Sequence, residues 1–550
     1  MKARIENTSV NSSDSASSRL VTIAMLVSLG SFFYYLRRGD ILMHGDATAH
    51  INIARRVIDS LTPGPLQLGT VWLPLPHLLM LPFLFSDALW QSGAAGSFPS
   101  MIAYVLGVLG IFRLVRTLFA PACAPQVASL GAWISALVYA ANPNLIYMQT
   151  TALTETLYLG FYVWAMVFFI VFVRTLGKAS ELEAADDAFA QRRALWNCSL
   201  SVACAEWTRY DGWFLAGVIG LMVLFIATRR WHDTRLRRQA IIFLAVIAAP
   251  AVVWLAYNAV IYGSALAFAT GPYSAHAIEQ LVAAPYPGLH HPWVAALYFL
   301  KSAQITLAVG NWGRFWVAAA VAATAIALHR IRRPAVIAAG ILLWTPLAFH
   351  TLSIAYGSVF VHVPMWWPFA IFNQRFGLEL LPLFAVSVGV LVAITAASIR
   401  HGWVLAVVAI LSIAASYAFV WKAAPLCSQE ASHNWEIRRA MDTAVARAVG
   451  GLPAGSRFLM DLGEHVGVME RLGIPLRRVV NTENHRPWKR PSDPDGVWER
   501  ALADPRQYVD YVVAFEGDAV DRKVNRRNLS LLTEIHALGR PPARIYSTRP

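Results

Sequence analysis

The segment "HGDATAH" (44–50) places one carboxylate and two imidazoles in a chain that is otherwise strongly apolar. Asp46 and His50 are four residues apart, so both lie on one face if the segment is helical. A carboxylate or an imidazole can accept the proton of an attacking hydroxyl or amine. Capping of a helix that begins near Ala47 is the alternative for Asp46, but a cap does not need His50. We therefore predict that Asp46 and His50 are catalytic.

A second acid, Glu155 in "TALTETLYLGF", stands at the start of a long hydrophobic run. Together with Asp46 it could bind a divalent cation such as Mg²⁺ or Mn²⁺; capping of an interfacial helix is the alternative. The neighbours of Asp46 in the sequence are Gly45 and Ala47, so no adjacent acid strengthens such a site. This favours metal independence, and the sequence predicts no other cofactor.

Arginines and their neighbours form the third set of candidates. In "EWTRYDGWF" (206–214) an arginine and an aspartate flank a tyrosine, and "FNQRFGLELLPLFA" (372–385) contains a single arginine. Guanidinium groups bind phosphate through parallel N–H bonds. The alternatives are an ion pair that caps helices and an arginine that snorkels toward water. The residues that we expect to bind substrate or phosphate are Arg55, Arg209, Tyr210, Asp211 and Arg375.

These polar groups stand among apolar blocks that are long enough to cross a membrane. Of 550 residues, 57% are hydrophobic and 14% are charged, whereas soluble proteins have about 25% charged residues. Blocks of roughly 17 to 23 apolar residues predict an α-helical polytopic membrane protein with about 11 transmembrane helices. The predicted spans are 20–36, 99–118, 127–146, 154–174, 194–208, 212–228, 240–262, 312–328, 336–353, 376–398 and 402–421.

The segment 71–85, "VWLPLPHLLMLPFLF", is also apolar, but it is short and contains three prolines. A full span there would invert every later loop and would destroy the difference in charge between the two sides. We interpret it as an interfacial or re-entrant helix that packs on the bundle.

The charge of the loops predicts the orientation of the spans. With the N-terminal tail, the loops on one side carry 18 Lys and Arg residues, and the loops on the other side carry 9 before the C-terminal domain. The positive-inside rule places the richer side in the cytoplasm. Residues 1–19 then form a disordered cytoplasmic tail, and 37–98 form the first extracytoplasmic loop. The basic residues form no stripe interleaved with aromatics, which argues against a nucleic-acid partner.

The long apolar runs stop near residue 426. The sequence therefore predicts a transmembrane domain over 20–425 and a soluble, extracytoplasmic α/β domain over 426–550. Strands expected in "SRFLMDL", "RRVVNTE" and "VDYVVAFE" alternate with helices, which is typical of a largely parallel sheet. Four cysteines in the whole chain are too few for a framework of disulfides.

Taken together, these features resemble the GT-C superfamily of integral membrane glycosyltransferases. The bacterial members related to protein O-mannosyltransferases and to the lipid A aminoarabinose transferase are the most similar. In these families, as in this sequence, a first helix precedes a long outer loop. The loop opens with an acid, here Asp46, and continues into a proline-rich apolar helix, here "WLPLPHLLMLP". A later outer acid, Glu155, and the stretch "RFGLELLP" complete the resemblance, which covers about residues 20–420.

The resemblance implies a hexosyl or pentosyl transferase in the inner (cytoplasmic) membrane of a bacterium. Its donor would be a sugar linked to a polyprenyl phosphate, and its acceptor a lipid, a glycan or a protein outside the cytoplasm. Asp46 would accept the proton of the acceptor, and Arg375 with Arg209 would stabilise the leaving phosphate, with inversion. The alternatives are a transporter or flippase, and a polysaccharide polymerase or ligase that uses polyprenyl-diphosphate glycans.

Overall fold

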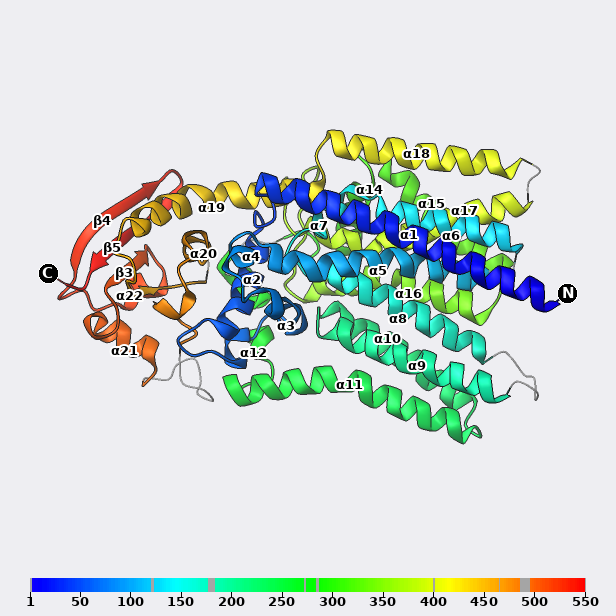
Figure 1. The fold of residues 1–550 in the computed structure, drawn as a ribbon, viewed down its shortest axis with the longest axis horizontal. Helices are drawn as coiled ribbons and strands as arrows, with labels where there is room; N and C mark the ends of the chain where they lie inside the picture. Colours follow the sequence, from blue (N-terminus) through cyan, green and yellow to red (C-terminus); the bar gives the residue numbers. More distant parts are fainter. Residues whose placement is uncertain are drawn as a thin grey trace.

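The computed structural model describes residues 2–119, 123–176, 184–271, 274–282, 286–398, 401–463, 465–484 and 495–549. A bundle of long helices forms one end of the molecule, and a smaller domain with a sheet forms the other (Figure 1). The N-terminus lies at the far end of the bundle and the C-terminus lies in the small domain, so the two termini are at opposite ends.

Eight segments of the described residues are helical, long and apolar enough to cross a membrane. They are Ser15–Arg38 within α1 (Lys2–Arg38), α5 (Ala94–Phe119), α8 (Glu155–Thr175), α10 (Asp211–Arg229), α11 (Thr234–Tyr262), α16 (Pro334–Tyr356), η3 with α17 (Gln374–Leu380 and Leu381–Ser398), and Trp403–Gly450, which holds most of α18 (Gly402–Lys422) and all of α19 (Leu426–Gly450). Each of these segments contains a predicted span to within one residue. The stretch 2–19, which was expected to be disordered, is the first part of α1 and is helical.

The three other predicted spans also form helices. They are α6 (Pro125–Ala140), α9 (Ala184–Glu206) and α15 (Gly313–Arg330). The predicted span 127–146 is longer than α6, and its last residues belong to the separate short helix α7 (Pro143–Met148). α6 packs against α5 and α17, α9 packs against α8 and α11, and α15 packs against α17. The prediction of a polytopic helical fold is therefore confirmed.

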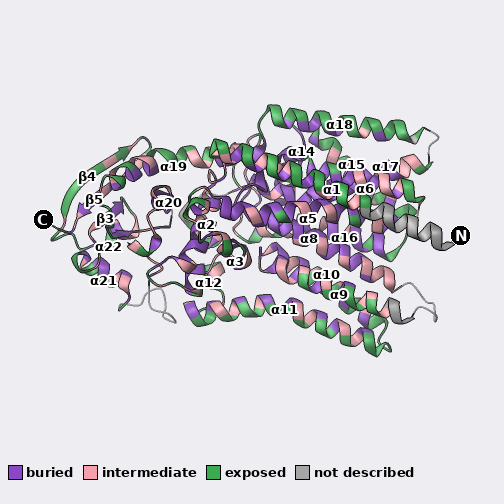
Figure 2. Cartoon of the chain, in the orientation of Figure 1, coloured by how far each residue is buried: buried purple, intermediate pink, exposed green. Residues whose placement is uncertain are grey.

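The centre of the bundle is formed by α5, α8 and α17. In the most apolar windows of α8 and of Gln374–Ser398, 72% of the residues are buried, against 28% in that of α11. Figure 2 shows α11 and α18 at the periphery with many exposed residues. Apolar side chains such as Ile241, Val252 and Val260 point outward from α11, as expected for a helix that contacts lipid tails, which are as apolar as these side chains.

The segment between α1 and α5 stays at the end of the bundle that faces the small domain (Figure 1). It forms α2 (Gly45–Ile58), η1 (Pro65–Leu68), α3 (Leu75–Met80), η2 (Leu81–Phe83) and α4 (Asp87–Gln91). Pro74 and Pro76 stand at the start of α3, and Pro82 stands in η2. Proline favours helix starts and interrupts helix interiors, so 71–85 forms short helices, and the prediction that it is not a full span is confirmed.

The small domain follows α19, which leads out of the bundle (Figure 1). Its sheet has the strand order β2-β1-β3-β5-β4. The three predicted strands are β1 (Phe458–Met460), β2 (Val479–Val480) and β3 (Tyr511–Phe515), and they pair in parallel as expected. β4 (Ser530–Ala537) and β5 (Arg540–Ser547) form an antiparallel hairpin that was not predicted. The sheet is therefore mixed rather than largely parallel. The short helices α20 (Gly467–Leu472), α21 (Val497–Ala503) and α22 (Ala519–Lys523) complete the domain.

Buried polar contacts join α2 to the small domain. Asp59, which follows the last residue of α2, accepts hydrogen bonds from Nε of Arg55 (2.9 Å) and from Nη1 of Arg477 (3.1 Å). Earlier in α2, Nδ2 of Asn52 donates to Oε2 of Glu470 at 2.6 Å. These contacts fix the small domain against the segment between α1 and α5.

We expect Asp59→Ala to lower the free energy of unfolding by about 3–5 kcal/mol, because it leaves the buried guanidinium of Arg55 without its principal partner. Arg55 keeps a second ion pair with Asp87 at 2.7 Å, but the side chain of Asp87 is 66% exposed, and such pairs contribute at most about 1 kcal/mol. Asp87→Ala is therefore the matched control. Thermal unfolding in detergent measures both variants, and equal Tm values for the two would contradict this account of the interface.

Candidate active site

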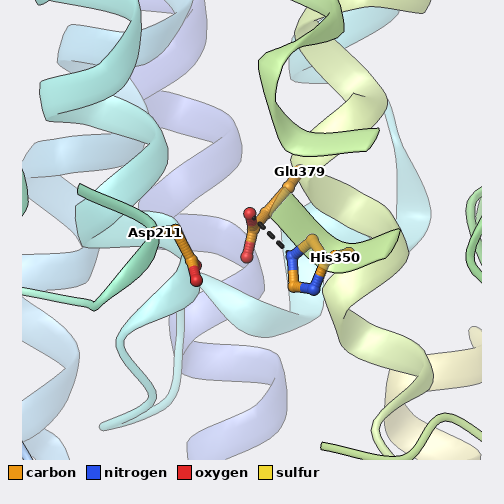
Figure 3. Close-up of side chains that lie close together, drawn as sticks. All are labelled: Asp211, His350 and Glu379. Atoms are coloured by element: carbon orange, nitrogen blue, oxygen red, sulfur yellow. Dashed lines mark ion pairs between the residues drawn. The ribbon is translucent and has the colours of Figure 1, made fainter. Parts of the chain in front are cut away.

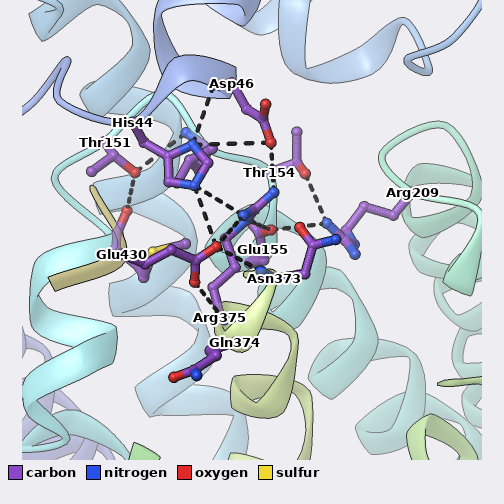
Figure 4. A network of polar contacts seen from close by, with 12 residues as sticks. His44, Asp46, Thr151, Thr154, Glu155, Arg209, Asn373, Gln374, Arg375 and Glu430 are labelled. Atoms are coloured by element: carbon purple, nitrogen blue, oxygen red, sulfur yellow. Dashed lines mark hydrogen bonds and ion pairs between the residues drawn. The ribbon is translucent and has the colours of Figure 1, made fainter. Parts of the chain in front are cut away.

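Arg375 is buried at the end of the bundle that faces the small domain, and its guanidinium binds three carboxylates (Figure 4). Nη2 donates to Oδ2 of Asp46 at 2.5 Å, Nε donates to Oε1 of Glu155 at 2.9 Å, and Nη1 donates to Oε1 of Glu430 at 2.8 Å. Nη1 also lies 2.9 Å from Nε2 of His44. One guanidinium on η3 thus joins α2, α8 and α19.

The local structure around η3 fixes the position of Arg375. Asn373, just before η3, has a φ of +54°, which asparagine tolerates better than most residues. Its backbone N–H donates to Glu430 at 2.8 Å, and the N–H of Arg375 donates to the same carboxylate at 3.3 Å. Gly377 packs so closely on α14 (Pro292–Leu307) that a Cβ would lie 2.5 Å from the backbone nitrogen of Ala303. A larger residue at 377 would displace the turn that carries Arg375.

Asp46 is the acid of this network that reaches solvent. Its side chain is 37% exposed, whereas those of Glu155 and Glu430 are 2% exposed. α2 begins at Gly45 and its N-cap is His44, whose Nδ1 accepts the N–H of Asp46 at 3.2 Å. The alternative that Asp46 caps the helix is therefore wrong, and its carboxylate is free to face Arg375.

The charges around Asp46 set its protonation. Desolvation in the site acts to raise the pKa of the carboxyl group, but the positive charge of Arg375, together with His44, outweighs it and holds the pKa of Asp46 below its ordinary value. Asp46 is therefore ionised at neutral pH and is able to accept a proton.

Arg209 is the second cation of the network and lies at the corner between α9 and α10. Nε donates to Oδ2 of Asp211 at 2.6 Å, Nη1 donates to Oε1 of Glu155 at 3.1 Å, and Nη2 lies 3.3 Å from Oε1 of Glu379. The corner is tight because Gly212 touches α9: a Cβ there would lie 2.4 Å from a backbone carbonyl. Glu155 accepts from both arginines and so links the two halves of the network.

Five of the eight residues predicted for the site meet in this network. They are Asp46, Glu155, Arg209, Asp211 and Arg375.

The other three predicted residues, His50, Arg55 and Tyr210, are directed elsewhere. Nδ1 of His50 lies 2.9 Å from Nε2 of His77, so its ring faces a second imidazole. Arg55 binds Asp59 and Asp87, and it also donates to a backbone carbonyl, so none of its partners belongs to the network around Arg375. The hydroxyl of Tyr210 donates to a backbone carbonyl of the outer segment at 3.0 Å. These three side chains stabilise the surroundings of the site in this geometry.

Four members of the network were not predicted as site residues: His44, Glu379, His350 and Glu430. His44 stands in the same motif as Asp46, and Glu379 follows Arg375 by four residues, so spacing alone could have found both. His350 and Glu430 give no such signal. The first lies within a long apolar run, and the second follows the last span in a segment that is typical of a soluble helix.

The guanidinium of Arg375 lies between Asp46 and Glu155, the pair for which a shared cation is predicted, and it donates to both. A cation there would have to displace this guanidinium. A different set of three residues offers ligand atoms that all lie within 4.8 Å of one another, namely Asp211, His350 and Glu379 (Figure 3).

Comparison with known proteins gives matches among solved structures alone. No family model matches the sequence, and no curated protein matches it. ArnT from Cupriavidus metallidurans, bound to undecaprenyl phosphate, is similar with a TM-score of 0.53 at 13% identity, over 96% of this chain and 98% of that one. The archaeal oligosaccharyltransferase AglB from Archaeoglobus fulgidus, in complex with an inhibitory peptide and a dolichol-phosphate, has a TM-score of 0.51 at 13% identity, over 91% of this chain and 69% of AglB.

These similarities define the class of the fold. The chain has the fold of ArnT and of AglB, with a polytopic helical domain followed by a C-terminal domain. The resemblance predicted from the sequence is confirmed at the level of the fold, over nearly the whole chain.

The imidazoles of His50 and His77 predict how stability depends on pH. Desolvation lowers the pKa of His50 to about 4 and that of His77 well below its ordinary value. Such groups stabilise the folded protein above their unfolded pKa, near 6.5, and this contribution is lost as the pH falls toward the folded pKa. We therefore expect the Tm in detergent to fall between pH 7.5 and pH 5, and to fall less steeply in His50→Asn.

His276 provides the control, because its side chain is 57% exposed on α13 (Ala275–Val282). His276→Asn should keep the wild-type dependence of Tm on pH. If His50→Asn showed the wild-type dependence as well, the neutral imidazole pair would have no part in stability.

Proposed function

We propose that this protein transfers a sugar from a polyprenyl-phosphate donor to an acceptor at the outer face of the membrane, with inversion. The observation that carries the proposal is the contact between Arg375, a buried cation that can bind phosphate, and Asp46, the acid of the network that reaches solvent (Figure 4). The lipid phosphates bound to the two structural neighbours, undecaprenyl phosphate in ArnT and dolichol-phosphate in AglB, support this class of donor.

Donor binding would exchange one partner of Arg375. Nε and Nη1 bind the buried acids Glu155 and Glu430, whereas Nη2 binds Asp46, which is partly exposed. An incoming phosphate therefore reaches Nη2 more easily than the other two nitrogens, and it can replace Asp46 there with a charge-assisted hydrogen bond. Arg209, bound to the other side of Glu155, supplies a second positive charge nearby.

The same exchange would prepare Asp46 to act as a base. Because the charge of Arg375 helps to hold the pKa of Asp46 down, loss of the contact raises this pKa and makes the carboxylate a stronger base. The acceptor oxygen or nitrogen then attacks the anomeric carbon, its proton passes to Asp46, and the bond from the anomeric carbon to the phosphate oxygen breaks. The polyprenyl phosphate leaves with negative charge that Arg375 stabilises.

The position of the site supports an outer active site. The network lies at the end of the bundle that adjoins the small domain, opposite the N-terminus (Figure 1). With the bias of loop charge, we place this end outside the cytoplasmic membrane of a bacterium, the N-terminus in the cytoplasm, and the domain over 426–550 above the site. A hexose or a pentose on the donor, and a lipid, a glycan or a protein as acceptor, are then the substrates to assay.

Asp46→Asn should reduce transfer by about 10²-fold or more, the usual scale for removal of a general base. Its Tm should stay at the wild-type value, because the amide oxygen can still accept an N–H from Arg375. The measurement is transfer from a panel of polyprenyl-phosphate sugars in proteoliposomes. Asp87→Asn, in the same outer segment, is the control and should be fully active.

Wild-type turnover in Asp46→Asn would remove Asp46 from the chemistry. Uptake of substrate into the vesicles without transfer would favour a transporter, and transfer from polyprenyl-diphosphate glycans alone would favour a polymerase or ligase.

Arg375→Lys tests the phosphate contact. A lysine keeps the charge, but its single ammonium nitrogen cannot reproduce the planar fork with which three nitrogens of Arg375 reach separate partners. The variant should therefore show a lower kcat and a higher KM for the donor, with the KM for the acceptor unchanged. Arg330→Lys is the control, because Arg330 is exposed near the C-terminus of α15 and should tolerate the change. Donor kinetics of Arg375→Lys equal to those of the wild type would exclude Arg375 as the phosphate ligand.

A further inference from the structure

Three buried side chains lie behind the two arginines and have no role in the proposed transfer. Asp211 stands at the start of α10, His350 lies in α16, and Glu379 lies in η3 (Figure 3). None of them is more than 5% exposed. One ligand atom from each lies within 4.8 Å of the ligand atoms of the other two.

Asp211 accepts a hydrogen bond from Arg209, and Glu379 lies 3.3 Å from the same guanidinium, but the polar atoms of His350 and Glu379 lack hydrogen bonds among the described residues. Neither ring nitrogen of His350 and neither carboxylate oxygen of Glu379 makes a hydrogen bond. Nε2 of His350 lies 3.0 Å from Oε2 of Glu379, but the contact does not have hydrogen-bond geometry. Buried polar atoms are nearly always satisfied, so four unsatisfied atoms on two adjacent side chains indicate a missing ligand.

Aromatic packing holds the imidazole of His350 in place without hydrogen bonds. Its ring lies between those of Phe299 and Phe376, with centroid distances of 4.3 and 5.4 Å. The ring is therefore fixed beside the two carboxylates, and a ligand would meet a preformed arrangement.

The network also contains more carboxylates than guanidinium groups. Two guanidinium groups, those of Arg209 and Arg375, meet five carboxylates. The acids are Asp46, Glu155, Asp211, Glu379 and Glu430. Arg209 faces both Asp211 and Glu379, and it also shares Glu155 with Arg375. Unbalanced buried charge is costly. A divalent cation beside Asp211 and Glu379 would reduce the excess of negative charge.

We propose that Asp211, His350 and Glu379 bind a divalent transition-metal ion, for which zinc is the best match. One imidazole nitrogen and two carboxylate oxygens from three separate elements form a ligand set that zinc takes, at about 2.0–2.2 Å. Magnesium prefers oxygen ligands and water to imidazole. An ion at this position would share the charge of Asp211 and Glu379 and would leave Arg209 more available to Glu155 and to an incoming phosphate. The site binds its ion whether or not the protein transfers a sugar.

The test is metal binding by the full-length protein, purified without a histidine tag and stripped with a chelator. Zn²⁺ bound after equilibrium dialysis is measured by mass spectrometry, and Co²⁺ is added separately to record its visible spectrum. We expect about one ion per chain, a Co²⁺ spectrum typical of nitrogen and oxygen ligands, and a rise in Tm with Zn²⁺. His350→Phe keeps the aromatic packing and Glu379→Gln keeps the shape, and each should bind at least about tenfold more weakly.

His362→Phe is the matched control, because His362 also packs against two phenylalanine rings, and it should bind like the wild type. Failure of the wild-type protein to bind either ion would overturn the proposal without any variant. Binding of the ion by His350→Phe with wild-type affinity would place the ion elsewhere and would overturn the proposal. The same holds if Asp46→Asn loses the ion while His350→Phe keeps it. A proton shared between the carboxylates of Asp211 and Glu379 would then explain how the two acids lie so close together.

Discussion

A buried guanidinium group needs partners for its charge and for its N–H groups, and Arg375 meets this need with acids from distant segments. Asp46 comes from the first turn of α2, Glu155 from the first residue of α8, and Glu430 from the second turn of α19. Each contact fixes the end of one element, so the geometry of the end of the bundle that faces the small domain depends on this one side chain. Since the two other acids are fully buried, Asp46 is the partner that a substrate can replace.

Two helices connect this arrangement to the small domain. α2 carries Asp46 in its first turn and ends beside Asp59, which binds Arg477 of the domain. α19 carries Glu430 near its start and then runs into the domain (Figure 1). A displacement of the domain would therefore move two of the acids around Arg375. The domain is thus expected to position the active site as well as to cover it.

The bundle could be predicted because a membrane span requires a long apolar run, which is visible in the sequence. Asp46, Glu155 and Arg375 could be found for the same reason, since charged residues at the ends of such runs stand out. Glu430 could not, because it does not stand at the end of a long apolar run and nothing in "LCSQEASHNW" marks it. The contacts of Arg55 could not be predicted either, because the sequence does not show that Asp59 and Asp87 bind it. The β4–β5 hairpin was missed because β4 is largely exposed and β5 contains two prolines, which weakens the strand pattern.

The exchange of partners at Arg375 is the central claim, and a structure of the protein in nanodiscs with a bound polyprenyl phosphate tests it most directly. We expect a phosphate oxygen at about 2.7–2.9 Å from Nη2 of Arg375, the carboxylate of Asp46 moved out of hydrogen-bond distance, and the contacts to Glu155 and Glu430 kept. A phosphate bound elsewhere, with the 2.5 Å contact between Arg375 and Asp46 intact, would contradict it.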